Sequence, residues 1–270
     1  GDRISGPRRP ARRSERFASL IRIDTINGQA ADEVVDNTRF DELPVAFPLE
    51  RFALGSQDPT VKAIEWLTPI GRGSRVTIVG PPQAGKTEAL RRLATELSGQ
   101  DGIELSIALV GVRPEEVREW SGAPDASNGS SGGTLEPATA ISFDASADAQ
   151  SQAVDRIVDR GRRLASRGSH VVLLIDSLDG LHPGAARKAL GSARNIVDGG
   201  SLTMIATATS PIGGETTLIA LDRSLTTGGR FPALDLSASW TMHAERLVGE
   251  AGAEAIATAR AQALSLADAQ

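Results

Sequence analysis

The octapeptide at residues 80–87 constrains the fold more than any other part of this chain. Its sequence, GPPQAGKT, matches the pattern G-x-x-x-x-G-K-[ST]. An apolar run at 76–79 precedes it, and a stretch of helix-favouring residues at 88–94 follows it. A strand, a glycine-rich turn and a helix in this order form a phosphate-binding loop, in which backbone N–H groups and the helix N-terminus surround the oxygens of a triphosphate.

Two side chains of this loop, which we call the P-loop, have predicted chemical roles. Lys86 places a positive charge where the β- and γ-phosphates would lie, and Thr87 offers a hydroxyl ligand to Mg²⁺. The residues predicted here to bind the nucleotide are Gly80, Pro81, Pro82, Gln83, Ala84, Gly85, Lys86, Thr87 and Glu88. ATP and Mg²⁺ are therefore the predicted cofactors.

A second chemical element ends the apolar run at 171–175. Asp176 follows this run directly, as expected for a buried parallel strand that carries a carboxylate to the edge where open α/β sheets bind ligands. Together with Thr87, Asp176 is predicted to organise the Mg²⁺ shell. An aspartate that merely caps the next turn would give the same pattern.

The remaining pattern predicts an α/β fold. Helices are expected at 61–67, after the P-loop, from Pro114, at 147–165 and at 185–197, and strands at 76–79, 103–110, 170–175 and 202–206. Strands that alternate with helices of this length form a parallel sheet with right-handed crossovers. The polar stretch 121–134 cannot bury apolar area and is predicted to be a mobile loop.

We expect three parts: a basic linker and connector at 1–55, a nucleotide-binding domain at 56–242 and a C-terminal helix at 243–270. The arginines of the leader are Arg3, Arg8, Arg9, Arg12, Arg13 and Arg16. This leader is predicted to be a solvated linker, and a contact with nucleic acid or a partner is the alternative.

Composition narrows the function classes. The net charge of -5 argues against nucleic-acid binding through bulk electrostatics. With no cysteine and 3 histidines, neither a disulfide framework nor a histidine-rich metal site is expected. The chain lacks long apolar runs and an N-terminal signal core, so no membrane association is expected and a cytoplasmic location is predicted.

Motifs spread over most of the chain resemble those of the ATPase domain of the bacterial transcription termination factor Rho. They are GPR at 6–8, ERF at 15–17, RFD at 39–41, FPLER at 47–51, TPIG at 68–71, the P-loop, RPEEV at 113–117, IDS at 175–177, ARNI at 193–196, GGSLT at 199–203 and FPALD at 231–235. The resemblance implies a RecA-like P-loop NTPase with a mostly parallel sheet flanked by helices. It also implies a ring-like, hexameric homo-oligomer, RNA-dependent ATP hydrolysis and helicase activity in transcription termination, with RNA and RNA polymerase as partners. By the same resemblance, Phe231 would stack on adenine, although a core phenylalanine would look the same.

Departures from the family pattern fall on the catalytic groups. The family has a glutamate that polarises the attacking water immediately before the RPEEV segment, and this chain has Val112 there. With Phe231 aligned, the family's two arginine fingers fall on Gly229 and Met242. Arg230, one position away, is the candidate substitute and, with Lys86, completes the predicted catalytic residues. Losing an acid-base group costs a factor of about 10² to 10⁴ in rate.

The two loops that grip RNA in the family are short here. The chain passes directly from Leu181 to Arg194 where the family has a long pore-lining segment, and the second pore loop is reduced to 211–215. RNA binding is therefore expected to be weak. Two hypotheses remain: a nucleotide-binding Rho relative with weak catalysis, and a fully active RNA-dependent ATPase and helicase that terminates transcription.

Overall fold

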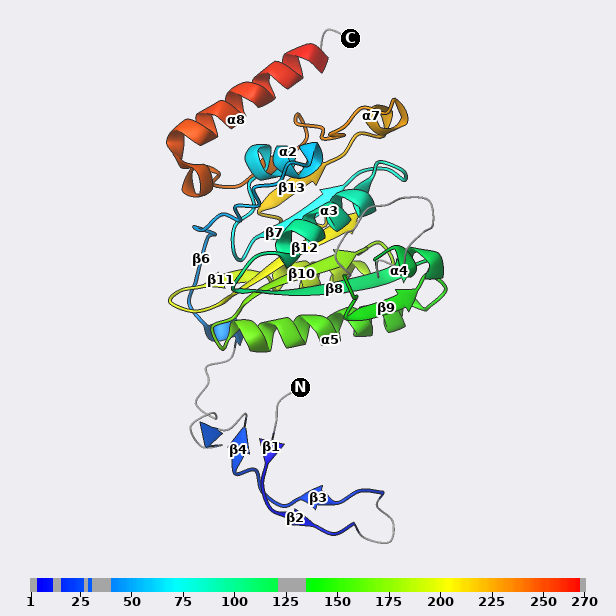
Figure 1. Ribbon diagram of the computed structural model, residues 1–270, viewed down its shortest axis with the longest axis vertical. Helices are drawn as coiled ribbons and strands as arrows, with labels where there is room; N and C mark the ends of the chain where they lie inside the picture. The colour runs from blue at the N-terminus through cyan, green and yellow to red at the C-terminus, as the bar shows by residue number, and fades with distance from the viewer. Residues whose placement is uncertain (1–3, 12–15, 27–28, 31–39, 121–134, 268–270) are drawn as a thin grey trace. The chain divides into compact units, whose positions relative to one another are not determined.

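The computed structural model describes the chain except for residues 1–3, 12–15, 27–28, 31–39, 121–134 and 268–270 (Figure 1). It divides into two units, Gly1–Leu43 and Pro44–Gln270. The predicted loop at 121–134 and the leader residues Arg3, Arg12 and Arg13 lie outside the described residues.

The first unit consists of short antiparallel strands. Its strands are β1 (Ile4–Ser5), β2 (Arg8–Arg9), β3 (Ser19–Leu20), β4 (Thr25–Ile26) and β5 (Gln29–Ala30), and a short 3₁₀ helix, η1, covers Phe40–Glu42. β4 pairs with β1 and β5, and β2 pairs with β3. No described residue of this unit is buried. The unit therefore has no hydrophobic core of its own among its described residues.

The second unit is built on one large sheet. Its strands are β6 (Val45–Ala46), β7 (Arg75–Val79), β8 (Ile103–Val112), β9 (Thr139–Ser142), β10 (His170–Asp176), β11 (Arg194–Ile196), β12 (Ser201–Ala208), β13 (Thr217–Ala220) and β14 (Trp240–Thr241). The order is β14-β13-β7-β12-β10-β8-β9, and the pairs from β13 to β9 are all parallel. β14 joins β13 antiparallel at one edge.

Helices cover both faces of this sheet. They are α2 (Pro59–Leu67), α3 (Lys86–Ser98), α4 (Pro114–Trp120), α5 (Ala147–Ala165), α6 (Pro183–Gly191), α7 (Arg223–Thr227) and α8 (Glu245–Ala267), which is interrupted at Gly249. Side chains alternate along a strand, so Val172 and Leu174 of β10 join the core that α3 also enters, whereas Val171 faces Gly161 of α5. The predicted mostly parallel sheet flanked by helices is confirmed.

One predicted helix is wrong over its second half. Helix 185–197 was expected, but α6 ends at Gly191 and residues 194–196 form β11. β11 pairs antiparallel with β12 through a tight turn in which Asp198 has φ 54°. Ile196 is buried in this hairpin, so its side chain gains packing in the sheet that it would lose in an exposed helix end.

Residues 44–55 belong to the second unit rather than to the connector. β6 pairs with β11, and Phe52 is buried in the core beside α2 and α3. Within the described part of the chain, no helix is long and apolar enough to cross a membrane.

Candidate nucleotide-binding site

The P-loop joins the end of β7 to the start of α3. Gly85 precedes α3 with φ 89° and ψ 20°, a left-handed conformation that costs little only for glycine. At Gly80, an added Cβ would lie 2.7 Å from the carbonyl oxygen of Leu221. Both glycines are therefore required by the backbone, which turns tightly from the sheet into the helix.

The Lys86 side chain folds back over the P-loop. Its ammonium group donates to the carbonyl oxygens of Gly80 at 2.6 Å and Pro81 at 3.2 Å. Burial lowers the pKa of Lys86, and the nearby carboxylates of Asp179 and Asp176 oppose this shift. The ammonium group thus lies between the loop backbone and two acids, where a phosphate oxygen could replace the carbonyl acceptors.

Asp176 ends β10 as a buried acid. The hydroxyl of Thr207 on β12 donates to its Oδ1 at 2.5 Å. Burial is the main influence on the pKa of Asp176 and raises it, the hydrogen bonds of Thr207 and Thr87 lower it, and the negative charge of Glu116 raises it. The structure thus places Thr87 and Asp176 close together, although they are far apart in sequence.

These two side chains fit a Mg²⁺ ion that arrives with a nucleotide. The described residues contain no group of three or more His, Cys, Asp or Glu side chains that could hold a metal alone. Mg²⁺ prefers oxygen ligands and usually takes only one or two from the protein, with phosphate oxygens and water completing its shell. The Thr87 hydroxyl and the Asp176 carboxylate are ligands of this kind, and a bound ion would neutralise the charge that burial disfavours.

Asp179 is an acid that the sequence analysis missed. Its carboxylate accepts from the backbone N–H of Thr209 at 2.8 Å and from the Thr209 hydroxyl at 3.0 Å. It therefore ties the loop after β10 to the end of β12, and its charge acts on Lys86. Its position just after a strand that ends in an acid was the available signal.

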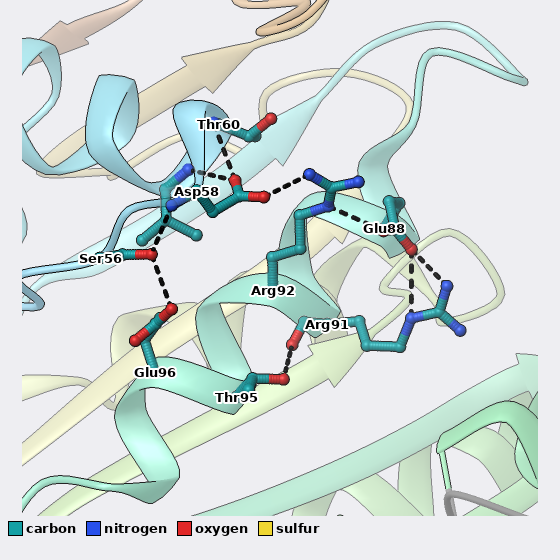
Figure 2. Close-up of polar contacts among 9 residues, drawn as sticks. Ser56, Asp58, Thr60, Glu88, Arg91, Arg92, Thr95 and Glu96 are labelled. Carbon is teal, nitrogen blue, oxygen red and sulfur yellow. Dashed lines mark hydrogen bonds and ion pairs between the residues drawn. The ribbon is translucent and has the colours of Figure 1, made fainter. Parts of the chain in front are cut away.

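The Glu88 carboxylate points along α3 rather than into the P-loop (Figure 2). It pairs with Arg91 and with Arg92, whose Nε lies 2.8 Å from Oε1. Arg92 also reaches Asp58 at 2.5 Å, and Arg91 reaches Glu119 of α4 at 3.0 Å. This acid-arginine network connects α3 to α2 and α4, so only the backbone of Glu88 is left to face a phosphate.

Asp58 has a second task in the same network. Its Oδ1 accepts from the N–H groups of Thr60 and Val61 and thereby caps α2 (Figure 2). The Ser56 hydroxyl donates to Glu96 of α3 at 2.6 Å. The start of α2 is thus fastened to α3 at two points.

Phe231 lies in residues 221–239, the segment between β13 and β14, which we call the excursion. Leu221 bridges to Leu234, and the Asp222 N–H donates to the Ala233 carbonyl at 2.9 Å, so the excursion is closed at its base. Phe231 is 58 % exposed, which leaves its ring available to a ligand rather than packed in the core. Arg230 is exposed beside it.

Val112, by contrast, is part of the hydrophobic core. It is the last residue of β8, is 7 % exposed, and clusters with Leu109 and Trp120. Glu116 follows Val112 closely in the chain, and its negative charge raises the pKa of Asp176. The Glu116 carboxylate accepts from the Arg113 N–H at 2.9 Å. The sequence analysis did not include Glu116 in the site, and its electrostatic effect on Asp176 was missed.

Residues 209–216 form the short connection from β12 to β13. Both strands are parallel to β7 and lie on either side of it, so residues 209–216 must cross over β7. The buried Glu215 carboxylate accepts from the N–H of Ile212 at 2.6 Å and of Gly213 at 3.0 Å. Arg75 also donates to the Gly214 carbonyl at 2.6 Å. The segment 211–215 is thus a turn fastened to the sheet.

Comparison with known families also points to a nucleotide-binding domain. The model of the "ATP synthase alpha/beta family, nucleotide-binding domain" matches residues 60–197, more than half of the chain. Transcription termination factor Rho of Neisseria gonorrhoeae is 29% identical over 92% of this chain and 67% of that relative. Rho of Streptomyces lividans is 31% identical over 92% of this chain and 40% of that relative.

Solved structures show the same fold. A prototypical ATPase from the type III secretion system of pathogenic bacteria has 22% sequence identity and a TM-score of 0.66, over 82% of this chain and 70% of that one. The assembled ATPase EscN from the type III secretion system of enteropathogenic E. coli has 20% identity and a TM-score of 0.62, over 79% and 57%.

Proposed function

Since the chain belongs to the ATP synthase alpha/beta family of nucleotide-binding domains, as a divergent Rho-like ATPase domain, we propose that it binds Mg-ATP and hydrolyses it slowly, with little response to RNA. The observation that carries this proposal is the contrast between two neighbouring strand ends. Asp176 ends β10 beside Thr87, whereas Val112 ends β8 inside the core.

Binding is supported by the groups around the P-loop. The glycines turn the backbone toward the ligand, Lys86 offers its ammonium group, and Thr87 with Asp176 offers oxygen ligands to Mg²⁺. Bound Mg²⁺ would neutralise charge on the phosphates. Phe231, exposed on the neighbouring excursion, provides a ring face for adenine.

Slow hydrolysis follows from the side chain at the end of β8. A valine can neither accept a proton nor orient a water molecule, and such a group contributes a factor of about 10² to 10⁴. In the ring assembly that we propose by resemblance, the neighbouring subunit would present Gly229 and Met242 where the family has arginines. A trans arginine contributes a factor of about 10³ to 10⁵ in related phosphoryl-transfer systems.

Weak RNA dependence follows from the two short connections. The turn 211–215 is held by Glu215 and by Arg75, and it leaves no free loop to enter a pore. The first connection, from Leu181 to Arg194, consists mostly of α6 and so contains no long free loop. RNA polymerase remains a partner by resemblance alone, and regulation or assembly is the role we favour for the domain.

A fully active RNA-dependent ATPase is the second candidate, and two observations favour it. The charge of Glu116 reaches Asp176, so a carboxylate lies near the metal site even though Val112 has replaced the family's glutamate. Arg230 is exposed and one position from an expected arginine finger.

Steady-state phosphate release by the full chain, with and without pyrimidine-rich RNA, separates these candidates. The proposal expects Mg-ATP binding with turnover far below the range of about 1 to 100 per second that is usual for phosphoryl-transfer enzymes. Turnover in that range, or a marked increase on adding RNA, would overturn it. Lys86→Ala, which removes the phosphate-binding charge, gives the background rate.

A further inference from the structure

Arg223 lies against the P-loop although it is distant in sequence. It is the first residue of α7, three residues after the last residue of β13. Its Nη2 donates to the side-chain Oε1 of Gln83 at 2.9 Å. Gln83 belongs to the P-loop itself; its backbone has φ 67° and the residue is exposed. The guanidinium group is therefore placed at the rim of the loop that would surround the phosphates.

Two other residues close to Arg223 in the chain contact the same loop. The hydroxyl of Thr226 donates to the carbonyl oxygen of Ala84 at 3.1 Å. The carbonyl of Leu221 approaches Gly80 so closely that no Cβ fits between them. The position of Arg223 thus depends on the packing of the excursion against the P-loop and not on one side-chain contact alone.

The charge of Arg223 has no carboxylate partner within the described residues. The adjacent Asp222 is engaged elsewhere, because its carboxylate accepts from the N–H of Ser224 at 2.7 Å and from the Ser224 hydroxyl at 2.8 Å. The other arginines at this end of α3 are neutralised: Arg91 and Arg92 pair with the acids of the network in Figure 2. A guanidinium group is charged at all physiological pH values and donates in a planar fork that suits phosphate oxygens.

We propose that Arg223 is a nucleotide-binding residue that contacts the α- or β-phosphate from the adenine side of the site. The sheet order places β13 on the opposite side of β7 from β10, so Arg223 lies on the side away from Asp176 and the proposed Mg²⁺ site. Phe231, the adenine platform, belongs to the same excursion as Arg223. A contact on this side is common to ATP and ADP, which differ only in the γ-phosphate. This inference rests on the proposed binding of Mg-ATP.

The experiment measures the affinity of the full chain for Mg-ATP and for Mg-ADP by calorimetric titration. Arg223→Gln should weaken both by about tenfold, the typical effect of one hydrogen bond to a charged group. Arg223→Lys keeps the charge but loses the planar pair of donors. Its affinities should lie between those of the unsubstituted chain and those of Arg223→Gln. Arg163→Gln removes the same charge from the exposed last turn of α5 and should change neither affinity.

Each outcome decides the matter. Unchanged affinities in Arg223→Gln would refute the contact while leaving the proposed function intact, and so would an equal loss in Arg163→Gln, which would indicate an effect of net charge. A loss confined to ATP would overturn the assignment to the α- or β-phosphate. Failure of the unsubstituted chain to bind either nucleotide would overturn the proposed function together with this inference. Melting curves without nucleotide should coincide for all variants, since Arg223 is exposed.

Discussion

The P-loop region and the end of β8 lie in one sheet and differ in how their residues are held. Around the P-loop, Lys86 bonds to loop carbonyls and Asp176 bonds to Thr207. At the end of β8, the side chain of Val112 contributes only apolar packing. The groups proposed to bind the nucleotide also hold the local structure together, whereas a group that serves only the transition state can be replaced by a core residue without a loss of packing. We propose that the site has kept binding and weakened catalysis for this reason.

The largest expected effect comes from the P-loop side of this comparison. Lys86→Ala should abolish the rise in melting temperature that Mg-ATP produces. A ligand at a hundredfold excess over its dissociation constant stabilises the folded state by about 2.7 kcal/mol, and the loss of binding removes all of it. The control is Lys62→Ala on the exposed side of α2, which should retain the full shift. An equal shift in Lys86→Ala would break the comparison, because the intact P-loop would then not be the binding site.

The next effect concerns the β8 side. Val112→Glu should raise single-turnover hydrolysis by much less than the factor of about 10² that a positioned acid-base group contributes. The structural reason is the apolar cluster around Val112, which disfavours a charged carboxylate. Groups that act as a unit are non-additive, so restoring one member recovers little.

Combining Val112→Glu with Met242→Arg sharpens the same point. Met242 is 43 % exposed, so an arginine there should not disturb the core. We expect the pair to exceed the single change. Full recovery by Val112→Glu alone would show that a usable arginine, with Arg230 as the candidate, already completes the site.

A smaller effect tests the burial of Asp176. Because burial raises its pKa above the unfolded value, this acid favours the folded state when protonated, and that contribution is lost as the pH rises through the raised pKa. Asp176→Asn should therefore raise the melting temperature of the nucleotide-free chain at neutral pH by a few degrees. The same variant should lose most of the stabilisation by Mg-ATP. A lower melting temperature without nucleotide would contradict the account.

The smallest effect is expected from the network in Figure 2. Arg92→Gln removes contacts to Asp58 and Glu88, but the side chains involved are 37% and 40% exposed for Arg92 and Glu88, so solvent weakens the pair. The free energy of unfolding should fall by less than about 1 kcal/mol. Measurement by urea denaturation should give a similar loss for the paired variant Glu88→Gln. A much larger loss in nucleotide affinity than in stability would show that the network positions the P-loop directly.

The sequence predicted local elements best where two signals agreed. The motif at 80–87 and the apolar runs beside it predicted β7, the P-loop and α3, and residues 147–165 form a helix with the predicted bounds. The hairpin β11–β12 was missed because Ile196 and Val197 continue a helical pattern, and only pairing with β6 and β12 makes residues 194–196 a strand. Tertiary context decided that segment.

The site was predictable in its motif residues and not in its long-range contacts. The P-loop and Asp176 follow from local pattern. Arg223 reaches the site because β13 lies beside β7, and Asp179 reaches it because β10 lies beside β12, the other neighbour of β7; the sequence does not specify this strand order. Glu88 directly follows the P-loop motif. Its pairing with Arg91 depends on the helical geometry of α3, which brings the two side chains together.

The most direct test of the central claim is a single-turnover measurement on the chain loaded with Mg-ATP, in the presence of saturating pyrimidine-rich RNA. We predict that the bound nucleotide remains ATP long after an enzyme turning over at about 1 to 100 per second would have converted it to ADP. Rapid conversion to ADP that depends on RNA would contradict the claim that binding has been kept while hydrolysis is slow.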